Sequence, residues 1–191
     1  MQNNSVKKIF FFGKDCSTFS PNSVEHAYLA LLNKDLASAN VIFSNLDSPR
    51  AKWGKILVSI LNGYMEIYPT YFLIRNFLEI DLDFLIKNEK IEYTEQLLGA
   101  LDYFVKINQE TYKFAARAMY ANKLYSASLM YMEKSKFVNY HDPELHFMLT
   151  RYYYDVHDYK QAYFYINECL NLLPDYYPAL IMKEKIEETW I

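Results

Sequence analysis

The stretch PELHFMLTRYYYDVHDYKQAYFYINECLNLLPDY, residues 143–176, decides the fold. Its second half places apolar or small side chains at spacings of three, four and three: Tyr159, Ala162, Ile166 and Cys169. These spacings put the four side chains on one face of a helix. Asp158 is suited to cap the start of that helix, and Pro174 cannot continue it. The stretch therefore predicts two amphipathic helices joined by a tight turn.

The composition indicates long helices with short connections. The 191 residues are 52% hydrophobic and include only 4 Gly and 6 Pro, which argues against both a disordered chain and a turn-rich all-β fold. A net charge of −3 does not favour binding to nucleic acid or to an anionic membrane surface. The two cysteines, Cys16 and Cys169, are too few for a disulfide framework, so we expect free thiols in a reducing compartment.

The chain has no stretch that predicts secretion or membrane insertion. The apolar run at 9–12 is too short for a signal-peptide core. The longest uncharged run lies between Asp35 and Asp47, far short of the roughly 20 residues that a membrane helix needs. We therefore expect a soluble, cytoplasmic protein. The high Lys, Asn, Ile, Tyr and Phe usage is typical of an AT-rich, bacterial genome.

The helical pattern repeats with a period of 34 residues. The second-helix quartet recurs as Tyr125, Ser128, Met132, Ser135 and as Ile91, Thr94, Leu98, Leu101. The first-helix set His146, Leu149, Thr150, Tyr153 recurs as Tyr112, Ala115, Ala116, Met119 and as Leu78, Asp81, Leu82, Leu85. Asp81 breaks the apolar pattern.

A fourth quartet is out of register with the other three. It consists of Leu36, Ala39, Phe43 and Leu46 and lies 55 residues before Ile91, which exceeds one period by 21 residues. That excess equals about one helix and a turn. We expect the extra helix at about 50–67. Alternatively, helices over 50–67 and 70–88 pair with each other and leave 91–108 as the odd helix.

A 34-residue helix–turn–helix period resembles the tetratricopeptide repeat (TPR) family. In the copy at 143–176, the residues at the family's Trp, Leu, Gly, Tyr, Tyr, Ala, Phe, Ala and Pro places are His146, Leu149, Thr150, Tyr153, Tyr159, Ala162, Ile166, Cys169 and Pro174. The resemblance implies an all-α fold, a right-handed superhelical array of antiparallel helix pairs. This TPR-like α-solenoid would contain about ten helices.

The expected organisation is an N-terminal arm over 1–20 and a single TPR-like repeat domain over 21–191. The parts of that domain are an N-terminal helix pair (21–47), an irregular extra helix region (48–74), a degenerate repeat (75–108), two repeats (109–142 and 143–176) and a capping helix (177–191). The capping helix shields the apolar face that the last pair would leave open.

No residue pattern predicts catalysis, a metal site or a cofactor. His141 and His157 flank one predicted helix and are therefore roughly 20 Å apart, and no histidine pair has the i, i+4 spacing of zinc enzymes. Gly13-Lys14 lacks the other residues of a phosphate loop. Solvated helix faces explain the carboxylates at 79–83. We therefore expect a protein that is not an enzyme.

The resemblance implies a partner-binding surface, because first helices line the concave groove in TPR proteins. The groove-facing positions of the two best repeats hold Lys113, Arg117, Tyr120, Phe147, Arg151 and Tyr154. Three cations beside three aromatic rings suit an acidic or aromatic peptide. In the alternative interpretation, the cations only solvate helix surfaces and the rings fill gaps.

We therefore expect a non-catalytic scaffold that binds a protein or peptide partner, and not nucleic acid, in its concave groove. The alternative is a structural subunit that acts mainly by self-association. Its contact would be the Phe10–Phe12 run or the last helix, over about 178–189. The sequence defines neither the partner nor the oligomeric state.

Overall fold

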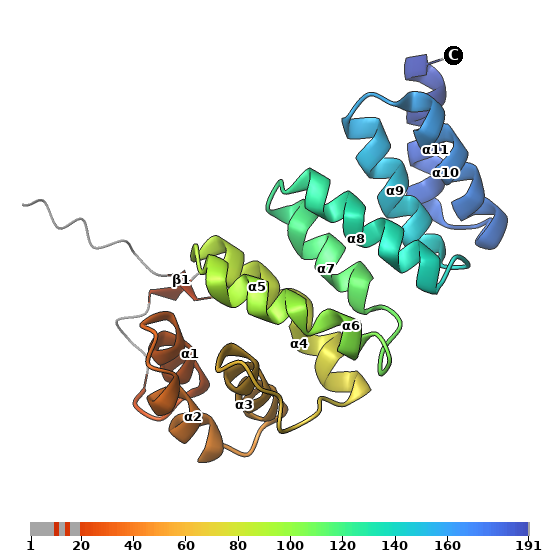
Figure 1. The fold of residues 1–191 in the computed structure, drawn as a ribbon. Coiled ribbons are helices and arrows are strands. Elements are labelled where there is room, and N and C mark those ends of the chain that lie inside the picture. Colours follow the sequence, from red (N-terminus) through yellow and green to blue (C-terminus); the bar gives the residue numbers. More distant parts are fainter. Residues whose placement is uncertain (1–9, 12–13, 16–19, 191) are drawn as a thin grey trace, which may run out of the picture. The chain divides into compact units, whose positions relative to one another are not determined.

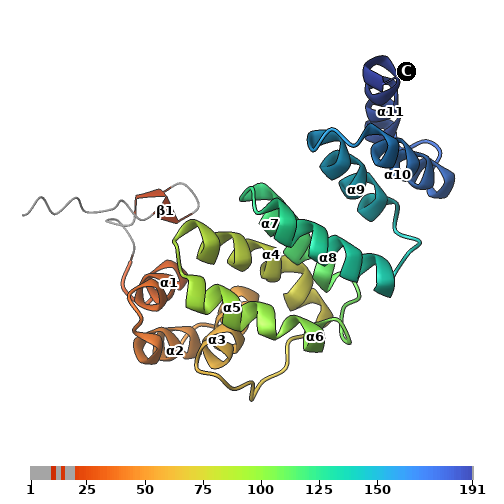
Figure 2. The ribbon, with the colours of Figure 1, turned by 45° about the horizontal axis from the view of Figure 1, so that its top comes forward.

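The computed structural model describes residues 10–11, 14–15 and 20–190, which are largely helical (Figures 1 and 2). Two short strands, β1 (Phe10–Phe11) and β2 (Lys14–Asp15), pair antiparallel, with Phe10 opposite Asp15. Residues 1–9, 12–13 and 16–19 of the expected arm, including Cys16, lie outside the described residues.

The described residues form eleven helices. In chain order they are α1 (Val24–Leu32), α2 (Leu36–Ser44), α3 (Pro49–Leu61), α4 (Tyr71–Lys87), α5 (Ile91–Gly99), α6 (Leu101–Phe104), α7 (Thr111–Ala121), α8 (Tyr125–Val138), α9 (Pro143–Asp155), α10 (Tyr159–Leu172) and α11 (Tyr177–Trp190). Six of them have a side-chain cap at the N-terminus: Ser23, Asp35, Ser48, Thr70, Asp142 and Asp158. The all-helical prediction is confirmed, with neighbouring helices packed in pairs.

Two predicted helix ends were wrong. The helix expected to reach residue 67 ends at Leu61, where Gly63 adopts a φ of 84° that favours glycine. The helix expected over 91–108 is interrupted after Gly99 and continues only as the single turn α6. The interruption explains why eleven helices are present where about ten were expected.

One turn geometry joins the helices of four pairs: α1 with α2, α4 with α5, α7 with α8, and α9 with α10. A non-glycine residue with positive φ stands at the centre of each turn: Lys34, Glu89, Lys123 and His157. In the first turn, the Lys34 and Asp35 amides donate to the carbonyls of Leu31 and Ala30, and the other three turns repeat this pattern. It is the hydrogen bonding of a Schellman motif. This turn pairs α4 with α5, and α3 has no such connection to either neighbour.

The chain divides into two compact units, residues 1–107 and 108–191. In the N-terminal unit, α3 contacts α1, α2, α4 and α5, and its Trp53 is fully buried. α3 packs closely on α2 because Gly54 has no Cβ. A Cβ there would lie 2.5 Å from ring carbons of Phe43.

A buried carboxylate links three helices of the N-terminal unit. Asp81 of α4 is fully buried, although the sequence suggested a solvated helix face at this position. Its Oδ2 accepts hydrogen bonds from Tyr28 Oη of α1 at 2.8 Å and from Trp53 Nε1 of α3 at 2.5 Å. Its Oδ1 forms an ion pair with the Arg50 guanidinium of α3.

Burial raises the pKa of Asp81 above its ordinary value, and Arg50, Trp53 and Tyr28 oppose this shift by favouring the ionised carboxylate. The Arg50 guanidinium lies over the rings of Tyr28 and Phe77, at 4.6 and 4.9 Å from their centroids. Burial, together with the charge of Asp81, raises the pKa of Tyr28 well above its ordinary value, so the phenol keeps the proton that it donates. A buried charge is tolerated when it is paired and hydrogen-bonded in this way.

One buried cluster of the C-terminal unit joins α10 to α11. It consists of Ala162, Ile166, Cys169, Ala179 and Ile186. His146 of α9 is also buried and stacks on the Tyr165 ring at 5.9 Å. Burial raises the pKa of the Cys169 thiol to about 11, which keeps it protonated and unreactive at neutral pH.

The Asp81 cluster can be tested by replacing its acceptor. Asp81→Ala leaves the Arg50 guanidinium buried without its carboxylate, so we expect the free energy of unfolding to fall by about 3–5 kcal/mol. Urea unfolding followed by helical circular dichroism measures the change. Asp83→Ala on the same helix is the matched control, because Asp83 forms a surface ion pair with Lys87 and its loss costs less than about 1 kcal/mol. Equal losses in the two variants would contradict the structural role of Asp81.

Candidate partner-binding site

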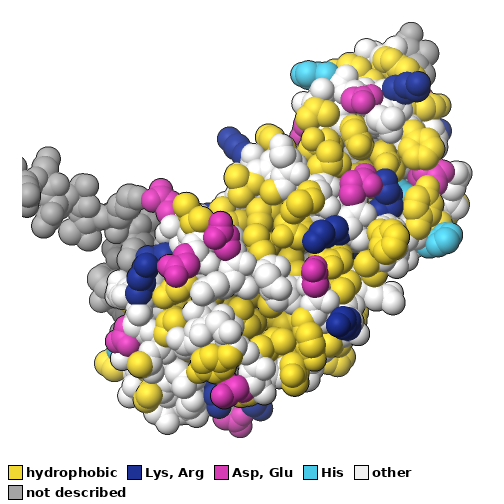
Figure 3. All heavy atoms as spheres, viewed as in Figure 1, with side chains coloured by type: hydrophobic (Ala, Val, Ile, Leu, Met, Phe, Trp, Pro, Cys, Tyr) yellow, Lys and Arg dark blue, Asp and Glu magenta, His cyan; other side chains and the backbone are white. Residues whose placement is uncertain are grey.

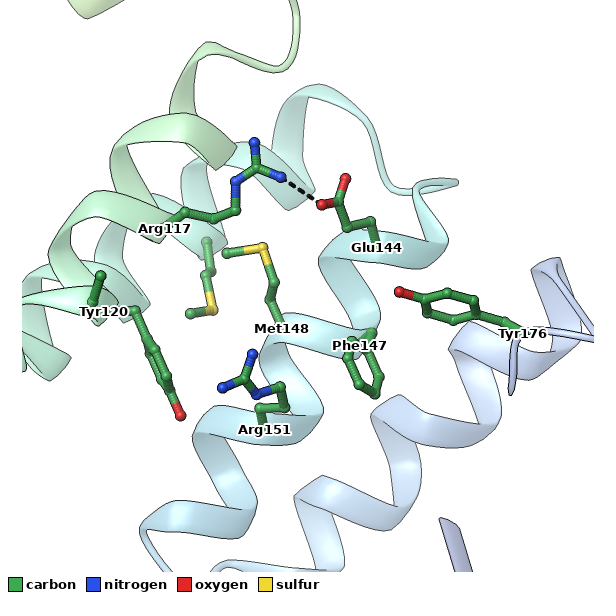
Figure 4. A pocket seen from close by; sticks show the side chains of 9 residues that line it. Arg117, Tyr120, Glu144, Phe147, Met148, Arg151 and Tyr176 are labelled. Atoms are coloured by element: carbon green, nitrogen blue, oxygen red, sulfur yellow. Dashed lines mark hydrogen bonds and ion pairs between the residues drawn. The ribbon is translucent and has the colours of Figure 1, made fainter. Parts of the chain in front are cut away.

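A surface hollow of about 370 Å³ lies between α7 and α9 of the C-terminal unit (Figure 4). We call it the α7–α9 pocket. It is lined by Arg117, Tyr120, Ala121, Met132, Glu144, Phe147, Met148, Arg151 and Tyr176. Four of the six residues predicted to bind a partner are among them, namely Arg117, Tyr120, Phe147 and Arg151.

The floor and one wall of the α7–α9 pocket are apolar. Met148 of α9 points toward α7 in Figure 4. The fully buried Met132 of α8 also lines the pocket. On the other side of α9, Phe147 packs its ring edge-on against Tyr176, with 5.4 Å between centroids. This lining suits a large aliphatic or aromatic side chain.

The two arginines of the pocket differ in their partners. Arg117 Nη1 forms an ion pair with Glu144 Oε1 at 2.5 Å, which Figure 4 shows as a dashed line. The exposed Arg151 packs its guanidinium over the Tyr120 ring, 5.4 Å from the centroid. No carboxylate of the described residues forms an ion pair with Arg151. Its charge is therefore available to a ligand, whereas that of Arg117 is already neutralised.

Tyr120 is held in place at the edge of the pocket. Its hydroxyl donates a hydrogen bond to Asp155 Oδ2. Asp155 lies one turn after Arg151 on α9, so this hydrogen bond engages the carboxylate that is nearest to Arg151 along the helix. Burial and this hydrogen bond raise the pKa of Tyr120, so it stays a donor at neutral pH. The hydrogen bond fixes the ring on which Arg151 rests.

Lys113 does not line the pocket. Its side chain is only 3% exposed, and its Nζ lies 2.6, 2.8 and 3.0 Å from carboxylate oxygens of Asp142, Glu144 and Glu110. Burial alone would lower the pKa of Lys113, but these carboxylates raise it. Asp142 also caps the N-terminus of α9. The structure thus places Lys113 in an ion cluster that joins α7 to α9.

Tyr154, the sixth predicted residue, faces α11. Its hydroxyl lies 3.4 Å from Thr189 Oγ1, and the Lys185 ammonium sits 4.6 Å from the centre of its ring. It therefore packs against the last helix and does not line the α7–α9 pocket.

Five lining residues were not among the predicted ones: Ala121, Met132, Glu144, Met148 and Tyr176. Glu144, Met148 and Arg151 are four and three residues apart on one face of α9, so helical spacing from Arg151 could have identified the first two. Tyr176 comes from the connection before α11, where no local pattern indicates the direction of its side chain.

The remaining described residues, within 20–190 and the two short strands, form a second hollow but no metal site. In this part of the chain, no group of His, Cys, Asp and Glu side chains is arranged to hold a metal ion. None of the helices described has the length and apolar character to cross a membrane. A second hollow, between α1 and α2, is lined mainly by uncharged side chains, among them Leu29, Val41 and Ile42.

The ion cluster predicts both a stability loss and a pH dependence. Lys113→Met leaves three carboxylates facing one another, two of them partly exposed, so we expect the free energy of unfolding at pH 7 to fall by about 2 kcal/mol. Lys113 lowers the pKa of Glu144, against the effect of burial, from its ordinary value of 4.5. The folded wild type therefore binds fewer protons than the unfolded chain, and its stability falls as the pH drops below that value.

In Lys113→Met this acid-induced loss is smaller, so the two proteins converge in acid. Urea titrations at neutral and acidic pH measure the difference. Lys160→Met, which removes an exposed lysine of α10, should match the wild type. A pH-independent gap between Lys113→Met and the wild type would show that the ion cluster does not determine it.

We compared the chain with protein-family models, with curated proteins and with solved structures. None of the three comparisons gave a match. The candidate site is therefore defined by its own geometry.

Proposed function

We propose that the chain is a non-catalytic protein-interaction scaffold and that the α7–α9 pocket binds a segment of a protein partner. The observation that carries this proposal is an apolar hollow beside Arg151, an exposed cation with no carboxylate partner in the described chain. An apolar anchor in a pocket supplies binding energy, and one uncompensated charge orients the ligand. The favoured ligand has a large apolar side chain close to a carboxylate.

Contacts between α7 and α9 also hold the pocket in a fixed shape, which supports a binding role. The Lys113 cluster holds the N-terminus of α9 against α7, and the hydrogen bond between Tyr120 and Asp155 spans the same two helices. A surface that is fixed before binding loses less conformational freedom when the partner arrives. Side chains that only solvate a helix would not need these supports.

We further propose that the helix pairs form a right-handed α-solenoid similar to TPR proteins, with the pocket on its concave surface. The four identical turns favour this arrangement. So does the spacing of α5, α8 and α10, which begin 34 residues apart at Ile91, Tyr125 and Tyr159. Cys169, a buried free thiol, agrees with a cytoplasmic location.

The binding proposal can be tested by filling the pocket. Ala121 is exposed at the end of α7 and lines the pocket, so Ala121→Trp places an indole in the hollow without disturbing the core. Peptides would be selected from a random displayed library on the wild type. We expect them to bind Ala121→Trp at least about tenfold more weakly, because the anchor site is occupied.

Ala37→Trp is the matched control, since Ala37 is an exposed helical alanine of α2 that lines the other hollow. It should bind the selected peptides as the wild type does. Charge reversal at Lys113 is unsuitable for this test because Lys113 is part of the core. If no selected peptide distinguishes Ala121→Trp from Ala37→Trp, the α7–α9 pocket is not the binding site.

A further inference from the structure

We propose that the α7–α9 pocket receives the outer face of α11 from a second copy of this chain. This inference rests on the proposed function, because it names the partner of the same pocket. The C-terminal unit itself carries a helix face whose apolar and charged groups complement those of the pocket.

The outer face of α11 is apolar where it begins. The residues that attach α11 to α10 are Ala179 and Ile186, both fully buried. On the opposite side of the helix, Tyr177 is 70% exposed, Leu180 40% and Ile181 48%. These spacings of three and four put the three side chains on one stripe. Apolar side chains are also open on the surface of the C-terminal unit in Figure 3, between scattered charges.

The same stripe continues with uncompensated carboxylates. Glu184 and Glu188 are exposed and form no ion pair with any cation of the described residues. The two lysines of α11 are directed elsewhere. Lys183 lies over the Tyr163 ring at 5.7 Å from its centroid, and Lys185 lies over Tyr154. The stripe is therefore apolar in its first half and negative in its second.

The pocket offers the complementary pattern at the same spacing. On α9, the apolar Met148 and the unpaired Arg151 are one turn apart, and on α11 the apolar Ile181 and Glu184 are also one turn apart. One helical turn rises by about 5.4 Å in both helices. With Ile181 or Leu180 in the hollow, the carboxylate of Glu184 lies within reach of the Arg151 guanidinium.

The contact can be made twice. Each copy carries both the pocket and the α11 stripe, so a two-fold axis pairs the pocket of each copy with α11 of the other. Two equivalent contacts double the buried apolar surface, which brings the interface closer to the roughly 800 Å² per partner of stable dimers. The contact then covers the exposed apolar residues of α11.

The test is a charge exchange between the two surfaces, measured by sedimentation velocity over a concentration series into the millimolar range. The wild type should dimerise. Arg151→Glu and Glu184→Arg each place like charges together, so each should weaken the dimer at least about tenfold. The double variant restores an opposite pair and should return to within about threefold of the wild type.

Both positions are exposed, so the variants should fold, which helical circular dichroism checks. Lys160→Glu changes the net charge as Arg151→Glu does, at an exposed site on α10, and should leave the dimer intact. Leu180→Asp should abolish the dimer by removing the apolar anchor.

The outcomes separate this inference from the proposed function. A wild type that stays monomeric throughout, or a dimer that is unaffected by Arg151→Glu and Leu180→Asp, overturns the α11 contact. The binding proposal would still stand if displayed peptides bind the pocket and fail to bind Ala121→Trp. Recovery of the dimer in the charge-exchanged double variant, with loss in both single variants, supports the α11 contact.

Discussion

A charged side chain that is buried among helices needs an oppositely charged partner, and each unit of this protein contains one such buried ion pair. In the N-terminal unit, Asp81 receives hydrogen bonds and charge from α1 and α3, so three helices converge on one carboxylate. In the C-terminal unit, Lys113 draws the N-terminus of α9 onto α7. Both interactions fix the relative orientation of the helices that they join, which apolar packing alone specifies less strictly.

The same constraint decides which charges remain for a partner. Lys113 and Arg117 are satisfied by carboxylates within the unit, whereas Arg151 rests only on the ring of Tyr120. On α11, the lysines cover tyrosine rings and Glu184 stays open. Only the charges that have no partner within the unit are available to bind another molecule. A count of all surface cations would therefore overstate the charge that a partner meets.

Most of the helix pattern could be predicted from sequence, because it depends on local spacing, caps and prolines. Asp158 caps α10 as expected, and α4 begins and ends within one residue of the expected 70–88. Asp81 shows where this reasoning stops. A carboxylate at a core position signals a buried partner, but nothing local identifies Arg50 and Trp53, which lie about 30 residues away. The burial of Lys113 could not be predicted for the same reason, since its carboxylates come chiefly from the next helix pair.

The four left-handed turns bear on how such a chain can change in length. Each turn completes its hydrogen bonds within the pair that it joins, so a helix pair carries its own connection. A duplication or deletion of about 34 residues, cut between pairs, adds or removes one pair and leaves every remaining turn complete. α3 ends in the same hydrogen bonds, at Gly63, but residues 62–70 separate it from α4, and its neighbours depend on it through Trp53 and Arg50. We therefore expect the C-terminal part of the chain to tolerate duplication or deletion of a whole helix pair. The part from α1 to α4 should not tolerate it.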